Sequence, residues 1–475
     1  MKQFNMVING KPVQTSTTFE IINPATGKVF ATCSSADAKI VDQAVAAAKA
    51  AFSQWSKTPI AVRKEKIHAI GAALEKNMPE LMELVTKETG KPMKGLNMIG
   101  SGMEVGGAAA WTHFTAELNL PIECVQDDDN TRIELHRKPI GVVVSILPWN
   151  WPLLIATWHV MPALLAGNTV VMKPSPLTPL STIRLVELAN EILPPGVLNV
   201  VTGDNSLGAT LTQHKDINKI VFTGSIATGK KIMSSASANL VRFTLELGGN
   251  DAGIVLPDVD VEKIAPALFT ACFHNNGQTC ACLKRLYVHE SIYDKVCNAL
   301  VSIAKKTKVG DGMQDVELGP IQNKMQFEKV KDFAKSVESA GGTFLCGGKP
   351  IDGEGYFFEP TIVANIKDGS KLVDEEQFGP IVPVIKYTDI ADAIAKANNN
   401  PAGLGGSIWS SNLAKAKELA VQLECGSVWI NEHGAIQPNM PFGGVKQSGI
   451  GIEFGQHGLE EFTTIQAIKM PKQVA

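Results

Sequence analysis

The hydrophobic positions of this chain follow two different periods. Apolar residues recur at spacings of three and four over residues 41–55 (VDQAVAAAKAAFSQW) and 61–74, and the first segment follows Asp37, which predicts two amphipathic helices. Four short β-branched runs then each lead to Pro or Gly and a helical stretch, which predicts β-α-β units on a parallel sheet buried on both faces. These runs lie at residues 140–147, 168–172, 197–202 and 219–223.

A second alternating set of apolar runs predicts a second α/β domain. Its members lie at residues 251–256, 286–288, 343–345, 381–385, 407–409 and 427–431. Before the first sheet, residues 122–126 and 131–137 alternate around a polar turn and predict a hairpin. Because a lone ribbon is marginal in water, we expect it to lie against another subunit, together with the strand 462–468. A ribbon folded back on its own chain is the alternative.

Length and composition indicate a globular protein that acts on small molecules. The 475 residues suggest about three domains of about 150 residues each. Hydrophobic residues make up 44% and charged residues 19%, and the net charge of -3 argues against a nucleic acid or an anionic membrane as partner. The most apolar stretch, 140–165, is interrupted by Pro148, Pro152 and Pro162, which argues against a membrane helix.

The N-terminus and the cysteines favour a cytoplasmic location. Residues 1–10 lack the pattern of a signal peptide. Eight cysteines are scattered over the whole chain, which suits reduced thiols better than a disulfide framework. Cys280 and Cys282 stand one residue apart without a second pair, so the zinc signal is weak and no metal is predicted.

The segment Gly277–Cys280 has the clearest chemical signal. A cysteine after a glycine-bearing turn is presented on backbone N–H groups, and its thiol can ionise and attack when a positive field or a nearby base assists it. Taken alone, such a cysteine is more often a small buried apolar residue.

Two polar residues stand in apolar surroundings. Glu246, in LELGG (245–249), is costly to bury unless it is partnered, faces a cavity or is protonated, and general-base catalysis is one reason to keep it there. A salt-bridged glutamate at a sheet edge is the alternative. Asn150 stands between two indoles in PWNWP (148–152), where its amide can stabilise an oxyanion or simply form a turn.

Two strand ends suggest a nucleotide. The run FTGSIATG (222–229) follows a strand and opens a helix whose free N–H groups favour a phosphate. It lacks the GxGxxG fingerprint, so an ordinary strand-to-helix turn is equally compatible. Lys173, in KPSP (173–176), ends another strand, where an ammonium can bond ribose hydroxyls or a phosphate, or remain a solvated charge.

Together these motifs resemble the aldehyde dehydrogenase superfamily over nearly the whole chain. The resemblance is greatest to the non-acylating, NAD(P)-dependent group and its bacterial, broad-specificity members. The motifs stand in the family's order and approximate spacing: PWNWP, KPSP, FTGS, LELGG, NNGQTC (275–280), EEQFGP (375–380) and PFGG (441–444).

The resemblance implies an enzyme that oxidises a small-molecule aldehyde to the carboxylic acid. It implies Cys280 as the nucleophile, Asn150 as the oxyanion donor and Glu246 as the base that activates water to hydrolyse the thioester. Glu453 and His159 are implied as a proton relay. The implied cofactor is NAD or NADP, and the residues implied to bind it are Trp149, Lys173, Ser175, Gly224, Ser225, Gly229, Glu376 and Phe378.

The family also implies a division of the chain. Residues 1–120 and 140–248 would form a dinucleotide-binding domain, and residues 249–447 a catalytic domain. The hairpin 121–139 and the segment 448–475 would form a small β oligomerisation element of a homodimer or homotetramer. The predicted fold class is therefore α/β, with two doubly wound α/β domains and this β element.

Three departures from the family pattern matter. Pro176 stands where NAD-preferring relatives often carry a glutamate that repels a 2′-phosphate, so NADP stays open. His159 stands where many relatives carry a lysine, and a relay through an imidazole would titrate near pH 6.5 rather than about 10. Asn250 replaces the lysine of the commoner ELGGK form, a change that the implied mechanism tolerates.

Five positions match those that line the family's substrate tunnel, and four of the five are apolar or aromatic. They are Trp151, Trp158, Thr279, Ile436 and Phe442. Since no arginine is among them to clamp a carboxylate, we expect uncharged apolar or aromatic aldehydes, with a semialdehyde as the alternative.

Other classes fit less well. Relatives that acylate coenzyme A generally lack the LELGG glutamate. A hydrolase with a Cys280–His274 pair would leave the nucleotide-like turns unexplained. A non-catalytic protein on this scaffold would be expected to have lost Cys280, Glu246 or Asn150, and all three are here.

Overall fold

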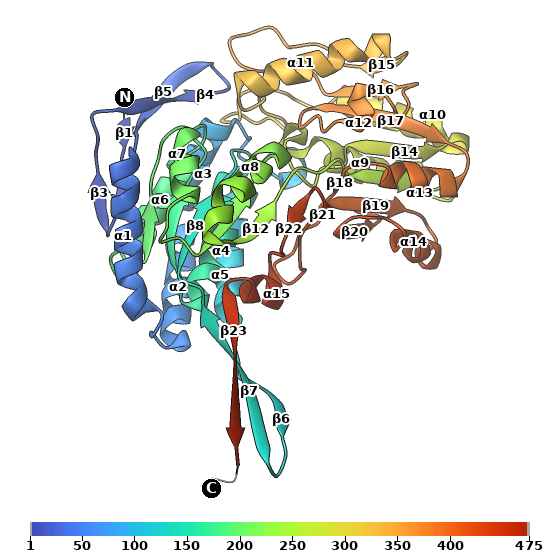
Figure 1. Cartoon of the computed structure of the whole chain (residues 1–475). Coiled ribbons are helices and arrows are strands. Elements are labelled where there is room, and N and C mark those ends of the chain that lie inside the picture. The colour runs from blue at the N-terminus through green and yellow to red at the C-terminus, as the bar shows by residue number, and fades with distance from the viewer. Residues whose placement is uncertain (1, 473–475) are drawn as a thin grey trace.

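The computed structural model describes residues 2–472, in which two large sheets lie side by side and a small third sheet projects from them (Figure 1). The first sheet has the strand order β22-β12-β11-β8-β9-β10-β2-β3. Its five central strands are parallel and mostly buried, which confirms the expected doubly buried sheet. These strands are β8 (Val142–Ile146), β9 (Thr169–Lys173), β10 (Leu198–Val200), β11 (Lys219–Thr223) and β12 (Arg242–Glu246).

Of these five strands, β12 was not predicted from the sequence, and neither were the remaining strands of this half. They are β2 (Met6–Ile8), β3 (Lys11–Val13) and β22 (Gly449–Ile450) in the large sheet, and β1 (Lys2–Phe4), β4 (Thr18–Asn23) and β5 (Lys28–Ser34) in a small sheet. The helices include both predicted ones. They are α1 (Ala38–Trp55), α2 (Ile60–Lys76), α3 (Met78–Thr89), α4 (Ser101–Glu117), α5 (Pro152–Ala166), α6 (Leu180–Asn190), α7 (Ser206–Thr212) and α8 (Ile226–Ala236).

The second sheet has the order β15-β16-β17-β14-β13-β19-β20, and only its edge strand β15 runs antiparallel. The fold is thus α/β, as predicted. The strands are β13 (Ala252–Val255), β14 (Arg285–His289), β15 (Thr343–Cys346), β16 (Thr361–Ala364), β17 (Ile381–Tyr387), β19 (Gly405–Trp409) and β20 (Ser427–Ile430). The helices are α9 (Val261–Phe273), α10 (Tyr293–Ala304), α11 (Lys324–Ser339), α12 (Lys371–Asp374), α13 (Ile390–Asn398) and α14 (Leu413–Ala420).

The third sheet contains the predicted hairpin, β6 (Glu123–Asp127) and β7 (Thr131–Pro139) (Figure 1). The C-terminal strand β23 (Thr463–Pro471) pairs antiparallel with β7 of the same chain over its whole length. The ribbon is therefore completed by its own chain, while β6 remains an exposed edge. Assembly into a dimer or tetramer through this element stays a prediction.

The segment after residue 447 does not lie wholly in this third sheet. Strand β22 pairs antiparallel with β12, and the Leu247 N–H donates to the Ser448 carbonyl at 2.8 Å. The pairing satisfies the free edge of β12, so the chain returns to the first sheet before the short helix α15 (Gly455–Glu460) leads to β23. Among residues 2–472, no helix combines the length and hydropathy needed to cross a bilayer.

The topology of the first sheet defines a crevice. The chain builds β8, β9 and β10 in one direction and then crosses to the other side of β8 to form β11 and β12. In open α/β sheets, ligands bind at the carboxyl ends of the strands that flank such a switch point. PWNWP follows β8, FTGS follows β11 and Glu246 ends β12, so all three motifs lie at this edge.

Buried carboxylates cap the first two helices at this edge. Glu104 of α4 accepts a hydrogen bond from the Leu153 N–H at the start of α5 at 3.0 Å, and Glu88 of α3 accepts one from the Leu180 N–H at the start of α6 at 2.7 Å. A helix N-terminus carries free N–H groups and a partial positive charge, which these carboxylates satisfy. Burial nevertheless raises the pKa of Glu88 to about 8.

Glu104 also forms a fully buried ion pair with Lys91. The Lys91 ammonium donates to the Asn150 carbonyl at 3.0 Å and lies 3.2 Å from the centroid of the Trp151 ring. The pair therefore connects α4 to the turn that carries Asn150.

We predict that Glu104 and Lys91 are strongly coupled in stability. Glu104→Gln leaves the Lys91 ammonium buried without its partner, and Lys91→Met leaves the Glu104 carboxylate buried without its partner. Each change should lower the free energy of unfolding by about 3–5 kcal/mol. The double variant should lose clearly less than the sum, because neither charge is stranded. The midpoints of urea unfolding of the four proteins measure the coupling, and strictly additive losses would contradict it.

Candidate active site

The turn that carries Cys280 depends on residues that tolerate a left-handed backbone. Asn275, Asn276 and Gly277 have φ values of 50°, 56° and 68°. Glycine, and to a lesser degree asparagine, adopts this region at little cost. A Cβ at Gly277 would lie 2.4 Å from the Gly379 carbonyl oxygen, so the close approach of the two segments also requires glycine.

Cys280 is partly exposed and packs against an apolar cluster. Burial raises the pKa of its thiol to about 12, an effect that the positive charge of Lys284 opposes and the negative charge of Glu246 reinforces. The sequence suggested a thiol that ionises readily. The pKa is raised instead, because burial disfavours the charged form of the thiol.

Asn150 is held next to the cysteine turn from two sides. Its side-chain amide donates to the Gln278 carbonyl at 2.9 Å, and its own carbonyl accepts from Lys91 and, at 3.2 Å, from the Asn275 amide. An NH₂ group has two N–H donors, so one bond to Gln278 orients the amide and leaves the other for a ligand. Among residues 2–472, no group accepts a hydrogen bond from the Cys280 N–H.

Glu246 is an unpaired buried carboxylate. Both of its oxygens are inaccessible and lack a hydrogen-bond partner among residues 2–472. Burial, and next the charge of Glu453, raise the pKa of Glu246 well above its ordinary value. A carboxylate so perturbed is a functional-site candidate, because a raised pKa makes it a stronger base once it has lost its proton.

The two residues of the predicted relay are in contact. His159 Nε2 lies 3.2 Å from Glu453 Oε1 and 3.0 Å from the Thr223 hydroxyl, and His159 Nδ1 lies 3.0 Å from the Ser145 hydroxyl. The negative charge of Glu453 also raises the pKa of Glu246, so this buried pair acts on Glu246 through its charge.

The start of α8 suits a phosphate. Ser225 is the N-cap, and its side chain accepts from the Thr228 N–H at 3.2 Å. Gly224 lies immediately before it, and Gly229 lets the helix approach the neighbouring segment, since a Cβ there would lie 2.7 Å from Leu247 Cδ2. The N-termini of α5 and α6 are occupied by Glu104 and Glu88, whereas α8 is capped by its own Ser225 and offers N–H groups to an anion.

Lys173 supplies an incompletely satisfied ammonium at the end of β9. The residue is 3% exposed, and among residues 2–472 its Nζ donates only to the Pro174 carbonyl, at 3.4 Å. Burial lowers the pKa of Lys173 to about 8. A ribose hydroxyl or phosphate would supply the missing partner. Ser175 lies nearby, and its hydroxyl accepts from the Leu177 N–H at 3.3 Å.

Three further residues expected to hold the cofactor meet between the two large sheets. The Trp149 and Phe378 rings pack edge to face with centroids 5.3 Å apart. Glu376 lies beside them and accepts from the Gly249 N–H at 3.2 Å, and its carboxylate lies 3.4 Å from Lys284 Nζ. Aromatic surface, carboxylate and the start of α8 together fit a nicotinamide dinucleotide.

The predicted substrate residues separate into two groups. Trp158, Ile436 and Phe442 belong to the apolar cluster around Cys280, which also contains Trp111, Trp429, Met440 and Phe454. Trp151 instead packs into the main core of the first half, and its indole N–H donates to the Thr279 hydroxyl at 2.8 Å. The cluster near the sulfur is thus rich in aromatic residues, and Trp151 lies outside it and binds the neighbouring Thr279.

His274 does not pair with Cys280. Its Nε2 lies 3.6 Å from Cys282 Sγ, and its Nδ1 contacts the Thr270 carbonyl at 2.9 Å. Burial lowers the pKa of His274 to about 4. The geometry therefore gives no support to the Cys280–His274 hydrolase.

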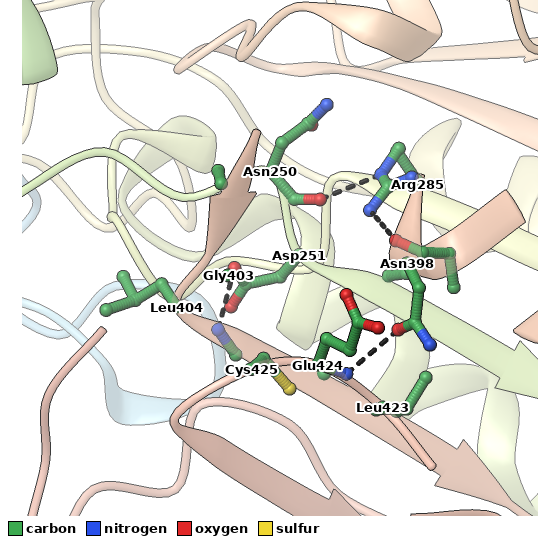
Figure 2. A pocket seen from close by; sticks show the side chains of 14 residues that line it. Asn250, Asp251, Arg285, Asn398, Gly403, Leu404, Leu423, Glu424 and Cys425 are labelled. Atoms are coloured by element: carbon green, nitrogen blue, oxygen red, sulfur yellow. Dashed lines mark hydrogen bonds between the residues drawn. The ribbon is translucent and has the colours of Figure 1, made fainter. Parts of the chain in front are cut away.

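Asn250 lines a separate cavity of about 20 Å³, which is room for one water (Figure 2). Its carbonyl accepts from Arg285 Nε at 2.8 Å, and its amide donates to the Val373 carbonyl at 2.9 Å. The residue thus joins the start of β13 to α12, and its contacts here are structural.

Sequence reasoning missed two lysines, Lys91 and Lys284. Both are 3% exposed or less, and each donates to backbone carbonyls of a catalytic turn. The signal that identified Glu246 applies to Lys284 as well, since it stands in the apolar run ACLKRLYV (281–288).

The chain was compared with known proteins. Residues 12–468 match the model of the aldehyde dehydrogenase family. The chain is 38% identical over 483 residues to phenylacetaldehyde dehydrogenase from Pseudomonas fluorescens, covering 98% of this chain and 95% of that protein. It is 36% identical over 460 residues to retinaldehyde dehydrogenase 3 from Rattus norvegicus, covering 95% and 89%.

Solved structures show the same architecture. Betaine aldehyde dehydrogenase from Staphylococcus aureus in complex with NAD+ superposes with a TM-score of 0.94 at 35% identity, over 98% of this chain and 94% of that chain. The chain therefore belongs to the aldehyde dehydrogenase family and is an oxidoreductase that acts on aldehydes.

Proposed function

We propose that the protein oxidises an uncharged aldehyde to the carboxylic acid with NAD or NADP, through a thioester on Cys280. The observation that carries this proposal is the meeting of three groups from separate segments. The Asn150 amide is bonded to Gln278, two residues before Cys280, and the charge of the unpaired Glu246 carboxylate acts on the Cys280 thiol.

The first step is addition to the carbonyl. The Cys280 thiol loses its proton, its sulfur forms a bond to the aldehyde carbon, and the carbonyl oxygen becomes an alkoxide. The free N–H of the Asn150 amide and the Cys280 N–H would donate to that oxygen, and such preorganised donors stabilise the tetrahedral state. The bond from Asn150 to the Gln278 carbonyl fixes the direction of the amide.

Oxidation and hydrolysis follow. Bound NAD or NADP supplies the acceptor for the hydride that leaves the tetrahedral carbon, which leaves an acyl group on Cys280. Glu246 then takes a proton from water, the resulting hydroxide attacks the acyl carbon, and the carbon–sulfur bond breaks to release the acid. The proton on Glu246 can pass to solvent by way of Glu453 and His159, which lie 3.2 Å apart.

The cofactor is proposed to lie across the switch point of the first sheet. The N-terminus of α8, with Gly224, Ser225 and Gly229, would bind the pyrophosphate, and Lys173 and Ser175 the adenosine ribose. Trp149, Phe378 and Glu376 would position the nicotinamide end. Pro176 adds no carboxylate to repel a 2′-phosphate, so both dinucleotides are proposed.

The aromatic cluster around Cys280 supports an uncharged apolar or aromatic substrate. Trp158, Ile436 and Phe442 offer no cation for a substrate carboxylate. The similarity to phenylacetaldehyde dehydrogenase supports the same class.

Asn150→Ala should lower kcat by ~10² to 10³ while the protein stays folded, because it removes one oxyanion donor. Steady-state oxidation followed by reduced-cofactor absorbance measures the loss. Cys280→Ala, which removes the nucleophile, sets the background. Full turnover in Asn150→Ala would remove the amide from the mechanism, and oxidation by Cys280→Ala would remove the thioester.

Glu246→Gln should accumulate acyl-enzyme. Addition and hydride transfer remain possible, so a stoichiometric burst of reduced cofactor should precede slow turnover. Because the pKa of Glu246 is raised and the base acts only when deprotonated, kcat of the parent enzyme should rise with pH through that raised pKa. The variant should lack this rise. Equal turnover of variant and parent would place the base elsewhere.

The substrate class is tested by comparing kcat/KM for benzaldehyde and hexanal with that for succinic semialdehyde. We expect the uncharged aldehydes to be preferred, because an unpaired carboxylate in the aromatic cluster is costly to desolvate. Each assay is repeated with NAD, with NADP and with added coenzyme A. A clearly higher kcat/KM for the acid would overturn the substrate class, and acyl-coenzyme A formation would overturn hydrolysis.

A further inference from the structure

Lys284 lies against the backbone of the cysteine turn and has no part in the mechanism above. Its ammonium donates to the Thr279 carbonyl at 2.9 Å and to the Cys280 carbonyl, and lies 3.5 Å from the Cys282 carbonyl. The side chain is 3% exposed. One cation therefore contacts three backbone carbonyls of this turn, those of residues 279, 280 and 282.

The other charged groups near Cys280 are mostly anions. Glu376, from the loop after α12, lies 3.4 Å from Lys284 Nζ, and its negative charge raises the pKa of the Cys280 thiol, as do the charges of Glu246 on β12 and Asp251 before β13. Lys284 is the charge that acts in the opposite direction.

The neighbouring titratable groups do not replace Lys284. Burial lowers the pKa of both His274 and His433, so that both imidazoles are neutral near pH 7, and His433 lies 3.4 Å from Asp251. Cys282 is buried beside His274. Lys329 of α11 donates to the backbone carbonyl of Glu376 at 2.9 Å and lies over the Phe333 ring.

We propose that Lys284 is a positioning residue that stabilises the thiolate of Cys280, and that Glu376 tunes this effect as the counter-ion of Lys284. The inference rests on the proposed function, in which Cys280 attacks as a thiolate. The thiol proton passes to solvent, and the negative charge left on sulfur is stabilised by the ammonium held under the same turn. The Glu376 carboxylate partly neutralises the positive charge of the Lys284 ammonium.

The test is the alkylation of Cys280 by iodoacetamide in the full-length protein without cofactor, followed by mass spectrometry of the Cys280 peptide from about pH 7 to 12, a range that reaches the raised pKa of the thiol. Since the thiolate is the reacting form, the pH at half-maximal rate reports its ionisation. We expect Lys284→Met to move this midpoint upward and to slow alkylation at pH 8 by about tenfold or more. Glu376→Gln should move the midpoint downward and speed alkylation several-fold.

Matched controls separate charge from packing. Lys284→Arg keeps the charge and should keep the midpoint of the parent, even where its longer group slows the reaction. Lys329→Met removes a cation that touches Glu376 but does not face Cys280, and should leave the midpoint unchanged. Cys124, which is exposed on β6, is an internal reference whose alkylation should be the same in every variant.

Several results would overturn the proposal. A loss of rate in Lys284→Met that is equal at every pH would show that the lysine only holds the turn. An unchanged midpoint in Glu376→Gln would remove the counter-ion, and this variant decides the matter if Lys284→Met does not fold. Alkylation involves no aldehyde turnover, so these outcomes stay separate from oxidation by Cys280→Ala, which tests the proposed function itself.

Discussion

The cost of taking charged groups out of water is the constraint on which this site depends. Lys91 and Glu104 offset this cost by forming a fully buried ion pair. Lys284 offsets it through backbone carbonyls and Glu376. The cost is not offset in this way for Glu246, because its carboxylate has no hydrogen-bond partner among residues 2–472. The paired charges thus hold the turns in place, and the unpaired Glu246 carboxylate is the group that we propose as the base.

The same constraint accounts for an unusual feature of the first sheet. A phosphate is normally expected at the first helix after the first strand of a dinucleotide fold, with a GxGxxG turn. Here Glu104 already occupies the N-terminus of α5, and Glu88 that of α6. The next strand on the other side of the switch point is β11, and its helix α8 is capped only by its own Ser225. Of these three helices, α8 is the one whose N-terminus is not occupied by a buried glutamate.

The parallel strands were largely predictable because their β-branched runs are short and end in Pro or Gly. Strand β12 was missed because Arg242 and Glu246 flank an otherwise short apolar segment, and β22 is only two residues long. Cys280, Glu246 and Asn150 could be proposed from the sequence because each is a chemically distinctive residue in a recognisable turn. The pairing of Lys91 with Glu104 was not predictable, since their contact depends on how α4 packs against α5.

The raised pKa of the Cys280 thiol was also beyond the sequence. Glycine before a cysteine suggests exposure of the backbone, but the side chains that bury the sulfur come from distant segments, such as Phe442 and Phe454. The anions that oppose its ionisation, Glu376 and Asp251, are likewise close to it only in the folded chain.

The hydrogen bond from Asn150 to Gln278 joins a turn after β8 of the first sheet to a turn before β14 of the second. In the proposed mechanism, the oxyanion donor Asn150 and the nucleophile Cys280 are therefore aligned only in one relative orientation of the two halves. A remote substitution that tilts one half by a small angle would misalign both reacting groups at once without touching either. In this architecture, the rigidity of the boundary between the halves is itself part of the catalytic apparatus.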